Sequence, residues 1–191
     1  MSYKKIKNNF SLQPSAFSIQ RGFTLMEAIV AIFVIITGIV GVMTLITFTI
    51  TSAQISKDKL IAAYLAQEGI EIVRNIRDTN WLEQYTNPNP WDEGLSVAEC
   101  SGTCDGAING CRVDYTYSEQ LDPSLLAYTG QFLNIDGNGY YSYLAGTQTK
   151  FKRKIVITPG ADILEVCSRV EWEEKGKIHQ VTAKEILYNW K

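Results

Sequence analysis

The 191-residue sequence lacks several features that would mark an enzyme or a nucleic-acid-binding protein. Its 18 Lys and Arg residues are outnumbered by 20 Asp and Glu residues, so the excess of basic charge typical of a nucleic-acid-binding protein is missing. The chain has one histidine, no nucleotide-binding glycine motif and no G-x-S-x-G motif. We therefore expect no catalytic site, no cofactor, no metal and no nucleic-acid partner, and we predict that the protein is not an enzyme.

Charge is also missing from one long stretch near the N-terminus. No charged side chain occurs from residue 28 to residue 50, and nearly all residues there are apolar. As a helix this stretch would extend ~35 Å, which exceeds a bilayer hydrocarbon core of about 30 Å. A secretory signal peptide would have a shorter apolar region and a cleavage site with small residues, and no such site follows Ile50. The stretch is predicted to remain in the mature protein and to span a membrane.

The residues before the apolar stretch are basic. The first 22 residues contain no acid, and their charged side chains are Lys4, Lys5, Lys7 and Arg21. Lys and Arg flanking a span stay on the cytoplasmic side. We therefore expect a single-pass protein of the cytoplasmic (inner) membrane, with its C-terminal part outside the cytoplasm.

Glu27 is an unusual residue at the entrance of an apolar span. An acid at the bilayer centre costs roughly 2.5–3.5 kcal/mol, and less near the edge, where the side chain can reach the interface. One interpretation is that Glu27 merely begins the span. The other is that its carboxylate has a dedicated cationic partner.

Residues 22–27, which read Gly-Phe-Thr-Leu-Met-Glu, resemble the type IV prepilin signal. Type IV pilins, minor pilins and the pseudopilins of type II secretion share this signal. All six positions fit, a basic leader precedes them, and the resemblance extends from Met1 to about Ser56. The apolar segment is most similar to PilV-type minor pilins and the related pseudopilins.

The resemblance implies specific roles for three residues. A prepilin peptidase would cut between Gly22 and Phe23, and a methyltransferase would methylate the new amino group of Phe23. Glu27 would pair with that amino group on a neighbouring pilin-like subunit. An α-amino group has a pKa of about 8 and is mostly cationic at neutral pH, so it offsets much of the cost of a buried carboxylate. The implied domains are a leader that is removed (1–22), an apolar helix (23–56) and an extracytoplasmic head (57–191).

The helical pattern continues into the head. Apolar residues recur at helical spacing beyond Ser56, at Ile61, Leu65, Ile72, Val73 and Ile76. We predict one helix from about Phe23 to about Asn80, apolar on all sides in its first half and amphipathic in its second. It must end before the prolines of segment 87–91.

The remainder of the chain favours β-structure. Six strands are predicted, over residues 113–117, 131–135, 140–144, 151–157, 163–172 and 177–188. In segment 163–172 the apolar residues share one face, and Cys167 lies on the polar face. Residues 136–139 are predicted to form a hairpin turn rather than a calcium loop. The expected fold is α+β and pilin-like: a long N-terminal helix packed on a small antiparallel sheet.

Four cysteines are candidates for disulfide bonds: Cys100, Cys104, Cys111 and Cys167. The C-x3-C-x6-C spacing has no suitable histidine for a metal site, and disulfides persist outside the cytoplasm. We expect two disulfides, although the sequence leaves all three pairings open. The partner of Cys167 is expected within residues 98–112, crossing the outside of the sheet.

The residue patterns and the resemblance together predict a minor type IV pilin-like subunit that enters or primes a pilus. One alternative is a pseudopilin of a type II secretion or DNA-uptake machine. An alternative from another class is a membrane-anchored binding module or adhesin with an aromatic surface. Core packing is the competing interpretation of those aromatic residues, which are Tyr140, Tyr141, Tyr143, Trp172, Tyr188 and Trp190.

Overall fold

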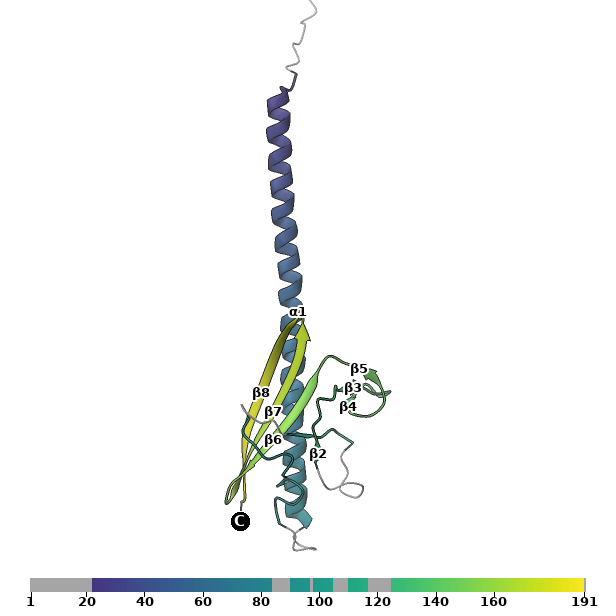
Figure 1. Ribbon diagram of the computed structural model, residues 1–191, viewed down its shortest axis with the longest axis vertical. Coiled ribbons are helices and arrows are strands. Elements are labelled where there is room, and N and C mark those ends of the chain that lie inside the picture. The colour runs from purple at the N-terminus through teal and green to yellow at the C-terminus, as the bar shows by residue number, and fades with distance from the viewer. Residues whose placement is uncertain (1–21, 84–89, 97, 105–109, 117–124, 191) are drawn as a thin grey trace, which may run out of the picture. The chain divides into compact units, whose positions relative to one another are not determined.

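The computed structural model describes residues 22–83, 90–96, 98–104, 110–116 and 125–190 (Figure 1). The basic residues before Gly22, most of the proline-containing segment 87–91 and residue 117 lie outside the described residues. The chain divides into two compact units, Met1–Phe48 and Thr49–Lys191. Each unit is described by itself.

A single helix, α1 (Leu25–Glu83), confirms the predicted long helix. Every described residue from 22 to 50 is exposed, whereas buried helix residues begin at Asp58. This change along α1 follows the sequence, because the first part is apolar on all sides and the second part has one apolar stripe. The second unit therefore contains the part of α1 that packs against other elements.

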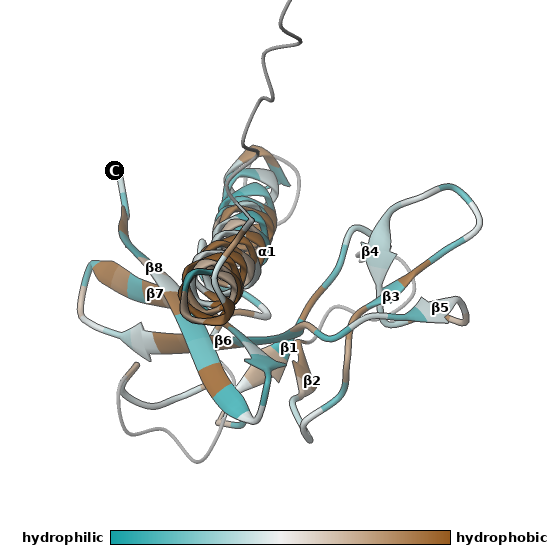
Figure 2. Cartoon of the chain, turned by 90° about the horizontal axis from the view of Figure 1, so that it is seen from above, coloured by the Kyte–Doolittle hydropathy of each residue, from teal (hydrophilic) through white to brown (hydrophobic). Residues whose placement is uncertain are grey.

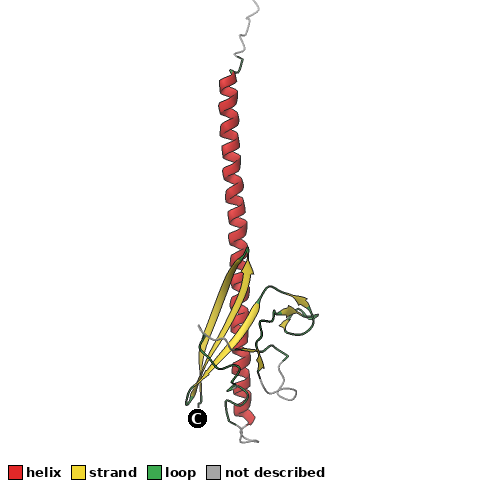
Figure 3. Cartoon of the chain, in the orientation of Figure 1, coloured by secondary structure: helices red, strands yellow, loops and turns green. Residues whose placement is uncertain are grey.

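Two antiparallel sheets accompany α1 in the second unit and confirm an α+β fold (Figure 3). The larger sheet has the order β2-β1-β6-β7-β8. Its strands are β1 (Cys111–Arg112), β2 (Leu126–Ala127), β6 (Lys152–Pro159), β7 (Ile163–Glu174) and β8 (Lys177–Tyr188). The smaller sheet, of order β4-β3-β5, comprises β3 (Asn134–Ile135), β4 (Tyr141–Ser142) and β5 (Thr147–Gln148).

The helix covers one face of the larger sheet (Figure 2). The inward face of β7 is the one predicted from its alternation, and its buried residues are Leu164, Val166, Ser168, Val170 and Trp172. One buried cluster joins Ile70, Val73 and Ile76 of α1 to β6 and β7. A second cluster joins Ala62, Leu65 and Ala66 to Phe151, Val170 and Trp172. Burial of these apolar surfaces, at about 25 cal/mol per Å², holds the helix on the sheet.

Between the two clusters a buried guanidinium meets the helix. Arg153 of β6 is fully buried. Its Nη1 donates a hydrogen bond to the Leu65 carbonyl oxygen (3.1 Å), and its Nη2 donates one to the Val113 carbonyl oxygen (2.6 Å). Nη1 also lies 3.3 Å from Oε1 of Glu68. These partners compensate for removing the charge from water.

Gly69 allows the helix to come this close to the sheet. A Cβ atom at residue 69 would lie 2.7 Å from Ser168 Oγ, 3.1 Å from Arg153 Cδ and 3.2 Å from Ile155 Cδ1. Glycine in a helix interior costs about 1 kcal/mol relative to alanine. Its presence here is explained by the close contact with β6 and β7.

The predicted strand over residues 113–117 is wrong. The structure has β1 earlier, at Cys111–Arg112, and a turn at residues 115–116. The cause is Asp114, whose Oδ1 accepts a hydrogen bond from the Thr116 N–H (3.0 Å) and whose Oδ2 accepts one from the Tyr143 N–H (2.6 Å). An aspartate that bonds to the backbone two residues later favours a turn over a strand.

The segments predicted as strands at 131–135 and 140–144 are strands for only two residues each. The turn between them is confirmed: Oδ1 of Asp136 accepts hydrogen bonds from the Asn138 and Tyr140 N–H groups, and Gly139 has φ of 88°. The Tyr115 hydroxyl donates to Asp136, which lowers the pKa of that carboxyl and raises the pKa of the tyrosine. These hydrogen bonds explain why residues 136–139 form a turn.

Gly69→Ala tests the close contact. We expect a loss of about 1–3 kcal/mol in the free energy of unfolding, because overpacking outweighs the gain in helix propensity. The measurement is urea unfolding of the full chain in detergent. Removing the Ser168 hydroxyl in Gly69→Ala/Ser168→Ala should recover much of the loss. Gly137→Ala is the control, since nothing lies within 4 Å of its added Cβ; equal stability of Gly69→Ala and wild type would contradict the packing argument.

Candidate functional site

The predicted processing segment lies at the start of α1 and forms a helix cap. Thr24 precedes the helix, and its Oγ1 accepts a hydrogen bond from the Glu27 N–H (3.3 Å). The Thr24 carbonyl oxygen accepts another from the Ala28 N–H (3.1 Å). Thr24 is therefore the N-cap residue and Glu27 the third helical residue, which is the spacing of a capping box. An acid in this first turn also interacts favourably with the helix dipole.

Gly22 and Phe23 lie outside the helix, on the N-terminal side of the cap. A Cβ atom at Gly22 would meet nothing within 4 Å, so the fold of the described residues does not require glycine there. The Phe23 side chain is 77% exposed. The Gly22–Phe23 peptide bond is thus non-helical and uncovered within the described part of the first unit.

The apolar side chains of the first unit are exposed from Phe23 onward. Large apolar residues follow one another around the helix, and about half or more of each is exposed. Apolar surface this continuous is not stable in water and indicates an apolar partner, either lipid or protein. Among the described residues one helix, α1, is long and apolar enough to cross a membrane.

The hydroxyl groups within this apolar stretch bond to their own helix. Thr37, Thr44 and Thr47 donate to the carbonyl oxygens of the residues four positions earlier. Such bonds satisfy a hydroxyl in a medium without water. These three threonines therefore do not oppose burial of the stretch in lipid.

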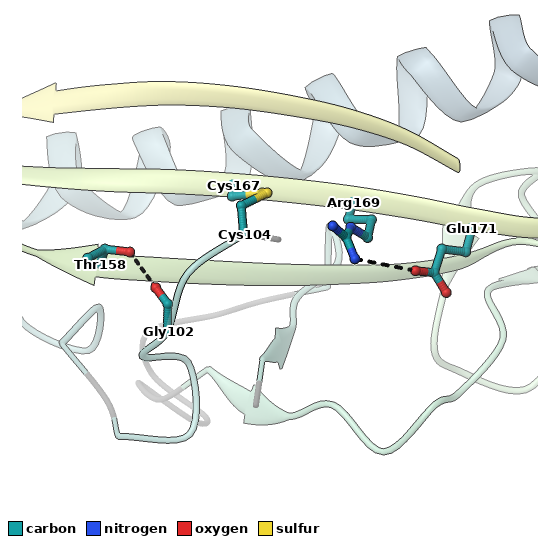
Figure 4. The surroundings of a disulfide bond; sticks show 6 residues. All are labelled: Gly102, Cys104, Thr158, Cys167, Arg169 and Glu171. Atoms are coloured by element: carbon teal, nitrogen blue, oxygen red, sulfur yellow. Dashed lines mark hydrogen bonds and ion pairs between the residues drawn. A yellow bond between two sulfur atoms is a disulfide. The ribbon is translucent and has the colours of Figure 1, made fainter. Parts of the chain in front are cut away.

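All four cysteines form disulfide bonds, which confirms the expectation of two bridges. Cys100 pairs with Cys111, and Cys104 pairs with Cys167. The second bridge lies on the outer face of the sheet, as predicted for Cys167 (Figure 4). Residues 98–104 form a strap across this face of the sheet. A hydrogen bond from the Thr158 hydroxyl to the Gly102 carbonyl oxygen also holds the strap on the sheet.

The aromatic residues proposed as an alternative binding surface do not lie together. Trp172 is buried in the second core cluster, and Tyr141 and Tyr143 pack against it. Tyr143 donates a hydrogen bond to the Arg153 carbonyl oxygen (2.8 Å), and burial raises the pKa of Tyr143 to about 12. Of these six aromatic residues, Tyr140, Tyr188 and Trp190 are exposed, and the ring centroids of Tyr188 and Trp190 lie 5.8 Å apart.

One feature of the candidate site, the Thr24 cap, was missed in the sequence although a signal was present. The Thr24 cap follows from T-x-x-E immediately before an apolar helix, which is the capping-box pattern. The turn at residues 175–176 between β7 and β8 could also be located from the sequence, but the hydrogen bond from Lys175 to Thr51 of α1 could not. No protein-family model, curated protein or solved structure matches the chain.

The pairing of the cysteines can be tested directly. Non-reducing peptide mapping of the native protein should find Cys100 linked to Cys111 and Cys104 linked to Cys167. Replacing Cys104 and Cys167 together by alanine should cost about 4 kcal/mol in unfolding free energy, because that bridge closes a long loop. Peptides that link Cys100 to Cys104 would contradict the assignment.

Proposed function

We propose that the protein is a minor type IV pilin-like structural subunit, cut by a prepilin peptidase and incorporated into a pilus or its priming complex. The observation that carries the proposal is the prepilin-like segment at residues 22–27, which lies at the capped start of a helix that is apolar and exposed up to residue 50. The α+β second unit, in which a helix packs on an antiparallel sheet, is consistent with a pilin-like head.

The cleavage step fits the chemistry of the segment. A peptidase needs an accessible main chain, and Gly22 and Phe23 precede the helix rather than form part of it. Cleavage there removes the basic residues of the leader from the subunit. Charged groups are costly in hydrocarbon, so their removal would let the apolar helix leave the bilayer during assembly. Phe23 would become the methylated N-terminal residue.

Glu27 would then supply the contact between subunits. Once the helix is buried among others, its carboxylate needs a cation, and the amino group of a neighbouring Phe23 is one. This pair would fix the axial register between helices, because apolar contacts alone are non-directional. The proposed location is the inner membrane with the head outside the cytoplasm, followed by the filament, and both disulfides are consistent with that compartment.

A second candidate within the same class is a pseudopilin of a secretion or DNA-uptake machine. It shares the processing segment and differs in the partner subunits. A membrane-anchored adhesin is favoured by one observation, the exposed pair of Tyr188 and Trp190. The mature N-terminus separates the adhesin from both pilin-like candidates, and the subunits recovered with the protein separate those two from each other.

Processing predicts a specific mature N-terminus. Protein purified from the native membrane should begin at Phe23, with a methylated amine. Gly22→Ala should block cleavage, although the added Cβ has no neighbour within 4 Å. Gly38→Ala is a matched control with equally open space and should be cut normally. A mature chain that starts at Met1, or after Ile50, would contradict the pilin-like proposal.

Glu27→Gln tests whether the charge of Glu27 is needed for assembly without disturbing the start of α1. Glutamine also suits the third position of a capping box, so the helix start should persist, and insertion and cleavage should remain normal. Incorporation into the filament or priming complex should fail, because an unpaired buried ammonium costs roughly 3–5 kcal/mol. Cross-linking to the other subunits measures this, with Glu165→Gln on the exposed face of β7 as control. Equal incorporation of Glu27→Gln and wild type would leave Glu27 as an edge residue of a membrane anchor.

A further inference from the structure

Exposed lysines gather at the end of the second unit where the apolar stretch of α1 ends. Lys57 and Lys59 of α1 are exposed, and so are Lys175, in the turn between β7 and β8, and Lys177, the first residue of β8. Lys175 Nζ donates a hydrogen bond to Thr51 Oγ1 (2.7 Å), so this turn lies beside α1 (Figure 1). Thr51 directly follows the uncharged stretch that ends at Ile50. Lys175 thus contacts the residue that follows the apolar stretch, and Lys57 and Lys59 lie within the next turns of α1.

Two of the acids nearest to these lysines share a fifth lysine, Lys150. Asp58 is buried and accepts a hydrogen bond from Lys150 Nζ (2.6 Å), and Glu174 accepts one from the same ammonium (2.8 Å). Burial lowers the pKa of Lys150, but these hydrogen bonds outweigh it and hold the pKa above the ordinary value for lysine. Glu173 is the exposed acid of the turn. The five lysines at this end outnumber its three acids, Asp58, Glu173 and Glu174, so its net charge is positive.

The positive end contrasts with the rest of the second unit. From residue 51 to residue 191 the sequence has 14 basic and 19 acidic residues. Acids dominate away from the lysine turn, for example at Asp78, Glu83, Asp92 and Glu93 near the C-terminal end of α1. The unit consequently carries its charges asymmetrically, with the lysines near Thr51 and acids near the C-terminal end of α1.

The backbone conformation of the turn between β7 and β8 does not explain why residue 175 is a lysine. Lys175 has φ of 52° and Gly176 has φ of 74°, and the two residues connect strands whose pairing ends at Glu174 and Lys177. A two-residue hairpin with both φ angles positive strongly prefers Asn, Asp or Gly at its first position. A lysine held there is conformationally unfavourable. Ile178, which follows the turn, is 76% exposed.

We propose that this end of the second unit binds an anionic phospholipid surface. The ammonium groups of Lys57, Lys59, Lys175 and Lys177 would face lipid phosphates, and Ile178 would enter the interface. Lys175 uses one of its three donors on Thr51, which leaves two for phosphate oxygens. Each lysine near an anionic surface strengthens binding about five-fold, and the attraction acts within about 8 Å at physiological ionic strength. The proposal rests on the membrane span of residues 28–50 and holds whether or not the chain enters a filament.

The test uses the full chain reconstituted into vesicles of phosphatidylcholine, with or without phosphatidylglycerol. A fluorophore on Ile178→Cys reports proximity to lipids that carry a quencher at the headgroup; the native cysteines are all paired and do not react. Ile186→Cys is the matched control on the same outer face of β8, about 26 Å further along the strand. The label at residue 178 should be quenched in the presence of phosphatidylglycerol and released by high salt, whereas the label at residue 186 should be unaffected.

Protease protection of the reconstituted chain is measured first. A chain that does not insert overturns both the lipid contact and the proposed function. A chain that inserts but shows equal quenching of the residue 178 label in both lipids overturns the lipid contact alone.

Two substitutions separate lipid binding from turn stability. Lys175→Asn supplies the residue that the turn prefers, so the melting temperature should not fall, while the ratio of surface-bound to free heads should drop about five-fold. Lys177→Gln should give a similar drop. Lys184→Gln on the same strand, away from the turn, is the charge control and should give none. A lower melting temperature for Lys175→Asn with unchanged quenching would show that Lys175 serves the fold and would overturn the proposal.

Discussion

The hydrogen bonds from the buried guanidinium of Arg153 fix how helix and sheet lie on each other in the second unit. The two apolar clusters on either side would tolerate small shifts, because hydrophobic contacts are non-directional. The guanidinium does not, since it must reach the Leu65 carbonyl oxygen on α1 and the Val113 carbonyl oxygen at the end of β1. Leaving a buried charge without its partners costs several kcal/mol. Arg153 therefore sets the register, and Gly69 supplies the room for it.

The long elements could be predicted because each repeats its pattern many times. The amphipathic half of α1 and strands β6 to β8 show clear periods of 3.6 and 2, and they lie where those periods placed them. Strands β1 to β5 span two residues each, too short for any alternation to be visible. Their positions depend on side-chain bonds such as those of Asp114, which tertiary contacts decide.

The burial of the Arg153 side chain could also be predicted from the sequence. It alternates in phase with Ile155 and Ile157, so the period of the strand places its side chain on the buried face. An arginine on a buried face predicts a carbonyl or carboxylate partner, although the sequence does not identify which one. The candidate site divides in the same way. Residues 22–27 could be recognised, and the Thr24 cap was readable, but the partner of Glu27 lies outside this chain and no pattern within the chain identifies it.

The bridge between Cys104 and Cys167 has a consequence for the direction of biogenesis. It joins residues 63 positions apart, and it can form only after β7 lies beneath the strap of residues 98–104. Thiols stay reduced in the cytoplasm and pair in an oxidising compartment. Once cross-linked, the second unit can no longer be drawn back through a membrane as an extended chain. In the extracytoplasmic location proposed for the second unit, forming this bridge would therefore prevent the folded unit from moving back across the membrane.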